Sequence, residues 1–256
     1  MKIYAIANQK GGVGKTTTSV NLAAALAAMR RRVLLIDLDA QGNATMGVGV
    51  DKHALENGAC EVLSDECAMA DAVQASETQS LWVLGANDTL TAAEVHLKQQ
   101  DQASGVLARQ LNSVREDYDV VVLDCPPSLS MLTVNALAAA DGVLIPMQCE
   151  YYALEGLSSL VRTIGQIRQS VNPRLQIAGI LRTMYDPRSN LSRQVSLELS
   201  KHFDDALLRT VIPRNVRLAE APSHGEPVLA YDPRSTGAKA YIALAGELSR
   251  REAKQA

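Results

Sequence analysis

The sequence has 256 residues, of which 47% are hydrophobic, and its formal net charge is -3. A chain of this size can bury one large core. No apolar run approaches the roughly 18 residues that a membrane-spanning helix needs. The four cysteines lack CxxC spacing, which is typical of free thiols in a cytosolic protein. The first residues run straight into a strand-like stretch, so we expect no signal peptide before the fold.

Short apolar runs rich in β-branched residues recur along the chain and predict strands that are buried on both faces. These runs are residues 3–7, 33–36, 81–84, 120–123, 143–145 and 177–180. The stretches between them predict helices at residues 16–32, 103–116, 130–140, 154–170, 191–203 and 235–254. We expect residues 51–80 to form a surface excursion with short helices. The alternation predicts a single domain over residues 1–256, with a doubly wound, mostly parallel α/β sheet covered by helices on both faces.

A glycine-rich segment, Gly11–Gly14, follows the first predicted strand and precedes an alanine-rich helix. In that context backbone N–H groups and the helix dipole converge on phosphate oxygens. A dinucleotide-binding fingerprint fits poorly, because its third glycine would fall on Thr17. The run Gly14-Lys15-Thr16 matches instead the end of a P-loop, in which the lysine contacts the β- and γ-phosphates and the hydroxyl ligates Mg²⁺.

The loop departs from the usual P-loop at its entrance, where Gln9 replaces a glycine and a second lysine, Lys10, follows. Because Lys15 already serves the phosphates of its own site, two alternatives remain for Lys10. It points to solvent, or it crosses a dimer interface and neutralises transition-state charge in the partner's site, as an arginine finger does.

Residues 10–17 resemble the deviant Walker A motif of the ParA/MinD ATPases, in which the first lysine acts in trans within an ATP-sandwich dimer. This resemblance favours the second alternative for Lys10 and implies ATP and Mg²⁺ as cofactors. It also implies nucleotide contacts along the whole loop, from Lys10, Gly11, Gly12, Val13, Gly14, Lys15, Thr16 and Thr17.

Two further segments are similar to the switch regions of that family. Residues 33–45, VLLIDLDAQGNAT, resemble the second strand and switch I, which implies that Asp39 orients the attacking water or senses the γ-phosphate. Asp37 would then lie nearer the outer shell of the metal. Residues 118–137 resemble Walker B and switch II. Asp124 ends an apolar run, so we expect its carboxylate at the carboxyl edge of the sheet, where it would hold Mg²⁺ through water.

The segments at residues 145–157 and 212–241 resemble partition ParA proteins of the Soj type. By that resemblance Pro213, Arg214 and Asn215 lie at the adenine pocket, and Asn215 reads the base through its amide.

Other relatives with the same loop fit less well. MinD-type proteins end in a basic amphipathic membrane-targeting helix, whereas here the four residues Tyr241, Ile242, Leu244 and Leu248 are expected to pack on the core. Relatives of the nitrogenase iron protein need paired cluster ligands, which Cys125 does not supply. The resemblance therefore implies a Mg²⁺-dependent ATPase for chromosome or plasmid partitioning. A MinD-like membrane-associated ATPase and a paralogue that positions another cargo remain open.

The resemblance also implies two partners, nonspecific duplex DNA and a ParB-like centromere-binding protein that stimulates hydrolysis. Residues 1–149 carry 10 Lys/Arg against 17 Asp/Glu, a charge of -7, whereas residues 150–256 carry 15 against 11, a charge of +4. One Phe and one Trp argue against base stacking, so DNA would be held through its phosphates. The candidate contacts are Arg188, Arg193, Arg217 and Arg234. We expect a cytoplasmic, nucleoid-associated protein without an N-terminal helix-turn-helix extension.

Overall fold

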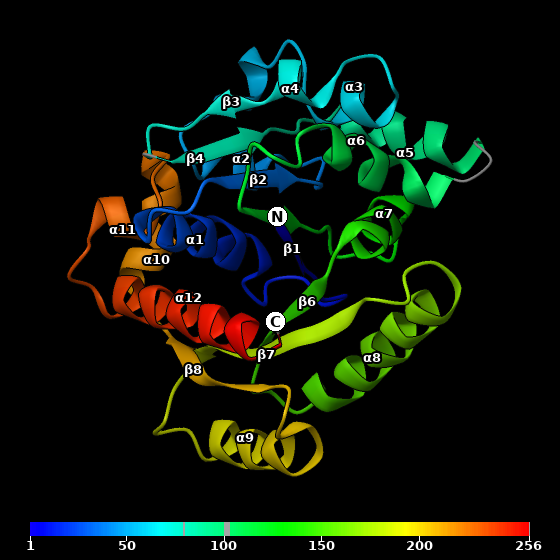
Figure 1. The fold of residues 1–256 in the computed structure, drawn as a ribbon. Helices are drawn as coiled ribbons and strands as arrows, with labels where there is room; N and C mark the ends of the chain where they lie inside the picture. The colour runs from blue at the N-terminus through cyan, green and yellow to red at the C-terminus, as the bar shows by residue number, and fades with distance from the viewer. Residues whose placement is uncertain (79, 100–102, 256) are drawn as a thin grey trace.

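A computed structural model describes residues 1–78, 80–99 and 103–255 of the chain. Within these residues the strands form one sheet in the order β3-β4-β2-β5-β1-β6-β7-β8 (Figure 1). Their bounds are β1 Lys2–Ile6, β2 Val33–Asp37, β3 Gln74–Ala75, β4 Leu81–Leu84, β5 Val120–Asp124, β6 Gly142–Gln148, β7 Gln176–Tyr185 and β8 Leu207–Pro213. Neighbouring strands are parallel except β3 and β4, which are antiparallel. The predicted doubly wound, mostly parallel sheet is confirmed.

Helices cover both faces of the sheet (Figure 1). The α-helices are α1 Lys15–Ala28, α2 Asn43–Met46, α3 Ala59–Leu63, α4 Met69–Ala72, α5 Leu90–Gln99, α6 Val106–Ser113, α7 Met131–Ala139, α8 Ala153–Ser170, α9 Asn190–Phe203, α10 Val216–Glu220, α11 Val228–Tyr231 and α12 Thr236–Gln255. Short 3-10 helices lie at Lys52–Ala54, Ala103–Gly105 and Ala221–His224. One hydrophobic core joins the sheet to α3–α9, and a second joins it to α1, α2 and α10–α12.

The two central strands β2 and β5 place acidic residues at the same edge of the sheet. All five residues of each strand are buried, because helices cover both faces. The strands are parallel neighbours, and their last residues, Asp37 and Asp124, stand opposite each other in the register. The carboxyl ends of these strands therefore bring two carboxylates together at the edge where α1 begins.

Some elements were not predicted from the sequence, namely β3, β8, α2, α5, α10 and α11. Strand β8 reads LLRTVIP and alternates buried with more exposed positions, because it lies at the edge of the sheet. The criterion of a run that is apolar on both faces therefore does not detect it. Helix α5 has weakly apolar composition and buries Leu90, Ala93 and Leu97 at helical spacing. Residues 51–80 hold the expected short helices α3 and α4, and residue 79 lies outside the described residues.

The ends of α1 and the packing of α12 also differ from the expectation. Helix α1 ends at Ala28 rather than near residue 32, and Arg30 adopts a left-handed conformation with φ of 63°. In α12, Tyr241, Leu244 and Leu248 are buried as predicted, but the expectation for Ile242 was wrong. Its side chain is 39% exposed.

None of the helices in the described part of the chain is long and apolar enough to span a membrane.

Candidate functional site

The glycine loop lies between β1 and the start of α1, at the carboxyl edge of the sheet. Gly12 and Gly14 have φ of 73° and 88°, a left-handed conformation that glycine adopts without strain. A Cβ atom added to Gly11 or Gly12 would meet nothing within 4 Å, so the inner side of the loop is open. Helix α1 has no acidic residue in its first turn. The positive end of its dipole therefore faces the loop without a carboxylate of the helix's own first turn to compete for it.

Lys15 begins α1 and extends into the loop with only 7% of its surface exposed. Its Nζ atom donates a hydrogen bond to the carbonyl oxygen of Lys10 at 3.2 Å. Burial lowers the pKa of Lys15, and the negative charge of Asp124 opposes this effect. A buried ammonium held by a neutral carbonyl is well placed to gain a phosphate oxygen.

Asp124 ends β5 and is fully buried beneath the start of α1. Its carboxylate accepts hydrogen bonds from Thr16 Oγ1 at 2.8 Å and from Ser19 Oγ at 2.7 Å. Burial raises the pKa of Asp124 to about 7, and repulsion from the carboxylate of Asp37 adds to the effect. A cation at this edge would relieve both contributions.

The residues at this edge fit Mg²⁺, which prefers oxygen ligands and usually keeps several waters besides phosphate and one or two protein groups. The Thr16 hydroxyl and the Asp124 carboxylate supply such oxygens within one hydrogen-bonded pair. No group of three or more His, Cys, Asp or Glu side chains among the described residues could hold a metal ion. Mg²⁺ that binds together with a nucleotide does not require such a group of side chains, because phosphate oxygens and water supply its other ligands.

Asp37 ends β2 and is hydrogen-bonded to the segment that follows this strand. It is fully buried, and its Oδ2 atom accepts hydrogen bonds from the backbone N–H and the hydroxyl of Thr45, at 2.9 and 2.8 Å. Its Oδ1 atom accepts from the backbone N–H of Asp39 at 3.1 Å. Burial raises the pKa of Asp37 to about 6, while these hydrogen bonds act in the opposite direction. These contacts make Asp37 an anchor for the segment after β2, and its position opposite Asp124 in the register leaves the outer-shell metal role a prediction.

Asp39 follows this anchor and is half-buried. Its Oδ1 atom accepts a hydrogen bond from the backbone N–H of Gln41 at 3.0 Å, which closes a turn. The carbonyl oxygen of Gln41 in turn accepts from Lys52 Nζ at 2.6 Å. The expected switch I segment is thus held at both ends, by Asp37 and by Lys52, with Asp39 between them.

Lys10 lies at the surface, in contrast to Lys15. About half of its side chain is exposed, and its Nζ atom forms an ion pair with Glu150 Oε2 at 2.5 Å. Its backbone N–H donates to Asn8 Oδ1 at 3.0 Å. Glu150 follows β6 and precedes two exposed tyrosines, Tyr151 and Tyr152, whose side chains pack edge to face. The Lys10 ammonium is therefore paired with Glu150 at the surface, whereas that of Lys15 is buried in the loop.

Pro213, Arg214 and Asn215 lie together beside the glycine loop. They line a cavity of about 180 Å³ together with residues from α1, β7, α10 and α12, among them Thr17 and Tyr241. The amide of Asn215, however, is used within the protein. Its Oδ1 atom accepts from the N–H of Leu218 at 3.2 Å as the N-cap of α10, and its Nδ2 atom donates to Thr236 Oγ1 at 2.8 Å.

Replacing Asn215 by alanine should lower the free energy of unfolding by about 1 kcal/mol, because the first turn of α10 loses its cap. Asn215→Ser keeps a capping oxygen and should retain most of the stability. Urea denaturation of the three proteins measures this difference. If Asn215→Ala changed the ratio of ATP to GTP affinity as well, the amide would contact the base despite its internal partners.

The arginines considered for DNA lie on the surface but are not equally free. Arg188 is 90% exposed and pairs with Asp186 at 3.1 Å, whereas Arg217 pairs with Glu220 at 2.7 Å and with Asp232 at 3.3 Å. Arg193 hydrogen-bonds Asn190 in the first turn of α9, and Arg234 is exposed just before α12. An exposed ion pair is weak, so a phosphate can replace the carboxylate partner.

Several contacts of the site were not anticipated from the sequence. Ser19 lies one turn after Thr16 on α1, so helical spacing alone could have placed both hydroxyls on one face. Thr183 Oγ1 donates to the carbonyl oxygen of Val13 at 2.7 Å, and Asn8 Nδ2 donates to that of Pro146 at 2.8 Å. These bonds join the loop to β6 and β7, and no local pattern indicates them.

Comparisons with known proteins agree with this site. A family model described as an AAA domain matches residues 1–177. The chain is 50% identical over 247 residues to the chromosome-partitioning ATPase Soj of Thermus thermophilus, covering 96% of this chain and 95% of that protein. It is 49% identical over 254 residues to the chromosome partitioning protein ParA of Caulobacter vibrioides, covering 98% and 95%. A crystal structure of cobyrinic acid a,c-diamide synthase from Mycobacterium smegmatis with bound ADP and magnesium has a TM-score of 0.88 and 37% identity, covering 100% and 97%.

The glycine loop before α1, the buried lysine and the acidic residue at the end of β5 define a P-loop nucleotide-binding protein. Two observations identify the family within this class: the extra lysine at the loop entrance, Lys10, and the similarity to the relatives named above. The chain belongs to the ParA/MinD family of P-loop ATPases, and the enzyme class expected from the sequence is confirmed.

Proposed function

We propose that this chain is a partitioning ATPase of the ParA type, acting as one P-loop domain that forms an ATP-dependent homodimer on nonspecific duplex DNA. The observation that carries the proposal is the pair of lysines around the glycine loop. Lys15 is buried within its own site, whereas Lys10 is half exposed and pairs with Glu150. The names of the relatives, which are chromosome-partitioning proteins, support the same role.

ATP and Mg²⁺ are the cofactors in this proposal. The backbone N–H groups of the loop and the ammonium of Lys15 bind the phosphates, and Thr16 together with Asp124 holds the metal. Mg²⁺ in such a site neutralises charge that develops on the phosphate oxygens. Pro213 and Arg214 contribute to the wall of the adenine pocket. Asp39 orients the water that attacks the γ-phosphate.

Lys10 is proposed to act in trans. When two loaded subunits close face to face, the Lys10 ammonium leaves Glu150 and contacts the phosphates of the partner subunit. Hydrolysis then loosens the switch segments at Asp39 and after Asp124, the dimer opens, and DNA is released. A ParB-like protein stimulates this step, and the chain acts in the cytoplasm at the nucleoid.

The proposal is tested by measuring binding to a random duplex with and without ATP over a range of salt concentrations. Affinity should require ATP, and log affinity should fall against log salt by roughly 0.9 per phosphate neutralised, or about 4 to 5 in total for two or three arginines from each subunit. Arg188→Glu and Arg193→Glu should weaken binding to unrelated duplexes equally, because phosphates carry no base identity.

Arg109→Glu is the matched control, since Arg109 is also exposed and paired with an aspartate, Asp65. It should leave DNA binding unchanged. Affinity independent of ATP, a flat salt response, or retention on phospholipid vesicles in place of DNA would contradict the proposed function.

Asp39→Ala should separate assembly from chemistry. The carboxylate is proposed to orient water, so its loss should slow hydrolysis by about 100-fold or more. The loop, Lys15 and Lys10 are untouched, so the ATP-bound dimer should still form and remain longer on DNA. Phosphate release and DNA dissociation are measured in parallel. Hydrolysis at the wild-type rate would show that another group orients the water.

A further inference from the structure

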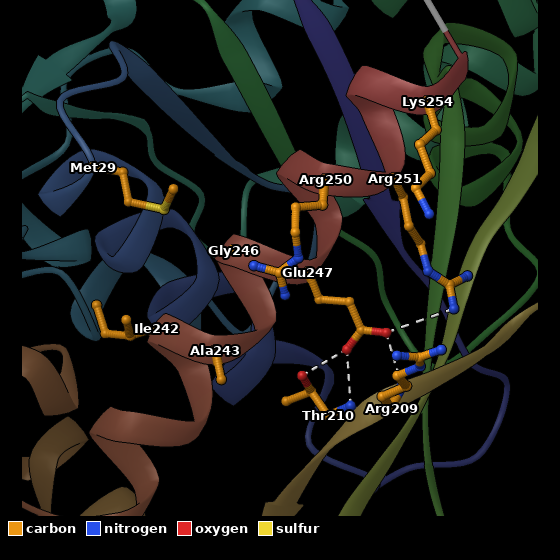
Figure 2. Close-up of a pocket in the computed structure, with 10 residues that line it drawn as sticks. All are labelled: Met29, Arg209, Thr210, Ile242, Ala243, Gly246, Glu247, Arg250, Arg251 and Lys254. Atoms are coloured by element: carbon orange, nitrogen blue, oxygen red, sulfur yellow. Dashed lines mark hydrogen bonds and ion pairs between the residues drawn. The ribbon is translucent and has the colours of Figure 1, made fainter.

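A groove of about 740 Å³ runs along α12, and residues of the edge strand β8 and the residue that follows α1 also line it (Figure 2). Residues that line it include Met29, Arg209, Ile242, Arg250, Arg251 and Lys254. Met29 follows the last residue of α1, whereas the glycine loop precedes the first, so the Met29 end of the groove lies about 20 Å from the loop along that helix, and no residue lines both the groove and the cavity beside the loop. It is therefore separate from the nucleotide site.

The groove combines apolar side chains with unpaired positive charge. Met29 is 42% exposed and Ile242 is 39% exposed, and both line the groove. The side chains of Arg209, Arg250 and Lys254 form no ion pair or hydrogen bond within the described part of the chain. An apolar surface bordered by free cations is complementary to a partner that is both apolar and acidic.

The acidic residue in the groove already has its hydrogen-bond partners within the protein. Glu247 accepts hydrogen bonds from the backbone N–H groups of Arg209 and Thr210, both at 2.8 Å, and from the Thr210 hydroxyl at 2.6 Å (Figure 2). Arg251 approaches the same carboxylate at 3.6 Å. Glu247 thus leaves the charge of the surrounding arginines and lysine available to a ligand.

The hydrogen bonds between β8 and Glu247 also determine which kind of peptide can bind in the groove. The pairing of β7 with β8 is irregular at residues 207–211, and this irregularity lets two consecutive N–H groups of β8 reach one carboxylate. Because these N–H groups are occupied, β8 cannot receive an added strand there. A ligand must bind through its side chains, as an amphipathic helix does in a groove.

We propose that this groove binds an acidic amphipathic helix of a partner protein. Apolar side chains of that helix pack on Met29 and Ile242, and its carboxylates pair with Arg209, Arg250 and Lys254. From Ile242 to Lys254 the groove follows α12 for about 18 Å, the length of a helix of about 12 residues. Duplex DNA would satisfy the charges but offers no apolar group to cover the two hydrophobic side chains.

The test uses the whole chain and a fluorescent synthetic helix of about 16 residues, with leucines at i, i+3, i+4 and i+7 spacing and glutamates between them. A second peptide has serine in place of leucine at equal charge, and a random duplex is the third ligand. Fluorescence anisotropy should show that the leucine peptide binds and that the serine peptide binds about tenfold more weakly or worse. The double variant Arg250→Glu/Lys254→Glu should bind the leucine peptide about tenfold more weakly or worse, and so should the single variant Ile242→Ser.

Arg168→Glu on α8 is the matched control, because Arg168 is exposed and α8 packs in the other hydrophobic core. It should bind the leucine peptide like the wild type. Thermal melting and ATP binding verify that each variant is folded. Absence of peptide binding, equal binding of both peptides, or loss of duplex binding without an effect on the leucine peptide would overturn the proposal.

Discussion

Replacement of Lys15 by alanine is expected to raise the dissociation constant for ATP by about 100-fold or more. The ammonium is buried in the loop and should pair with phosphate charge there, and removal of one partner from such a buried pair costs about 3–5 kcal/mol. Isothermal titration calorimetry with Mg²⁺ and ATP measures the change. Lys10→Ala is the matched control, since it removes a lysine from the same loop and should change ATP affinity little.

Thermal melting of Lys15→Ala shows whether the variant has lost only the nucleotide site or the whole fold. Burial lowers the pKa of Lys15 by more than the negative charge of Asp124 raises it, so on balance the surroundings disfavour the charge in the absence of nucleotide. Lys15→Ala should therefore melt at the wild-type temperature or above it when no nucleotide is present. ATP should then raise the melting temperature of the wild type but not that of the variant. Wild-type ATP affinity in a folded Lys15→Ala protein would remove Lys15 from the binding site.

The central strands of the sheet could be predicted because their burial leaves a pattern in adjacent residues of the sequence. Strands β1, β2 and β5 are covered on both faces, so each reads as an uninterrupted apolar run. The edge strand β8 is covered less completely and carries Arg209 and Thr210 at its centre. Its pairing depends on β7, and its backbone depends on Glu247 from α12, which lies more than 35 residues later.

The glycine loop could also be read from the sequence, because glycine conformation, lysine and hydroxyl all fall within a few adjacent residues. Hydrogen-bond and ion-pair partners that come from distant segments could not be predicted in this way. Glu150 lies 140 positions from Lys10, and nothing at either position indicates the ion pair. Asn215 shows a second limit, because a residue placed correctly beside the cavity has its amide bound to Leu218 and Thr236.

The Lys10–Glu150 ion pair leads to the second large effect, the loss of ATP-dependent dimerisation in Lys10→Ala. Both side chains are about half exposed, so the pair contributes only about 0–1 kcal/mol and is readily exchanged for a stronger partner. A phosphate group in the water-excluded interface between two subunits is such a partner. Lys10→Ala should bind ATP with nearly wild-type affinity but sediment as a monomer with ATP, and its hydrolysis rate should fall by about 1,000-fold or more.

Glu150→Gln provides the matched variant, because it keeps the size of the side chain and removes the charge that holds Lys10 in its own subunit. If Lys10 acts in trans, this variant should dimerise with ATP at the same protein concentration as the wild type or at a lower one, as measured by sedimentation velocity. Adding Lys10→Ala to it should abolish dimerisation again, which would show that the lysine, and not the glutamate, makes the contact across the interface. Normal dimers together with normal hydrolysis in Lys10→Ala would refute the trans role, and the ion pair with Glu150 would then be a surface contact without a part in assembly.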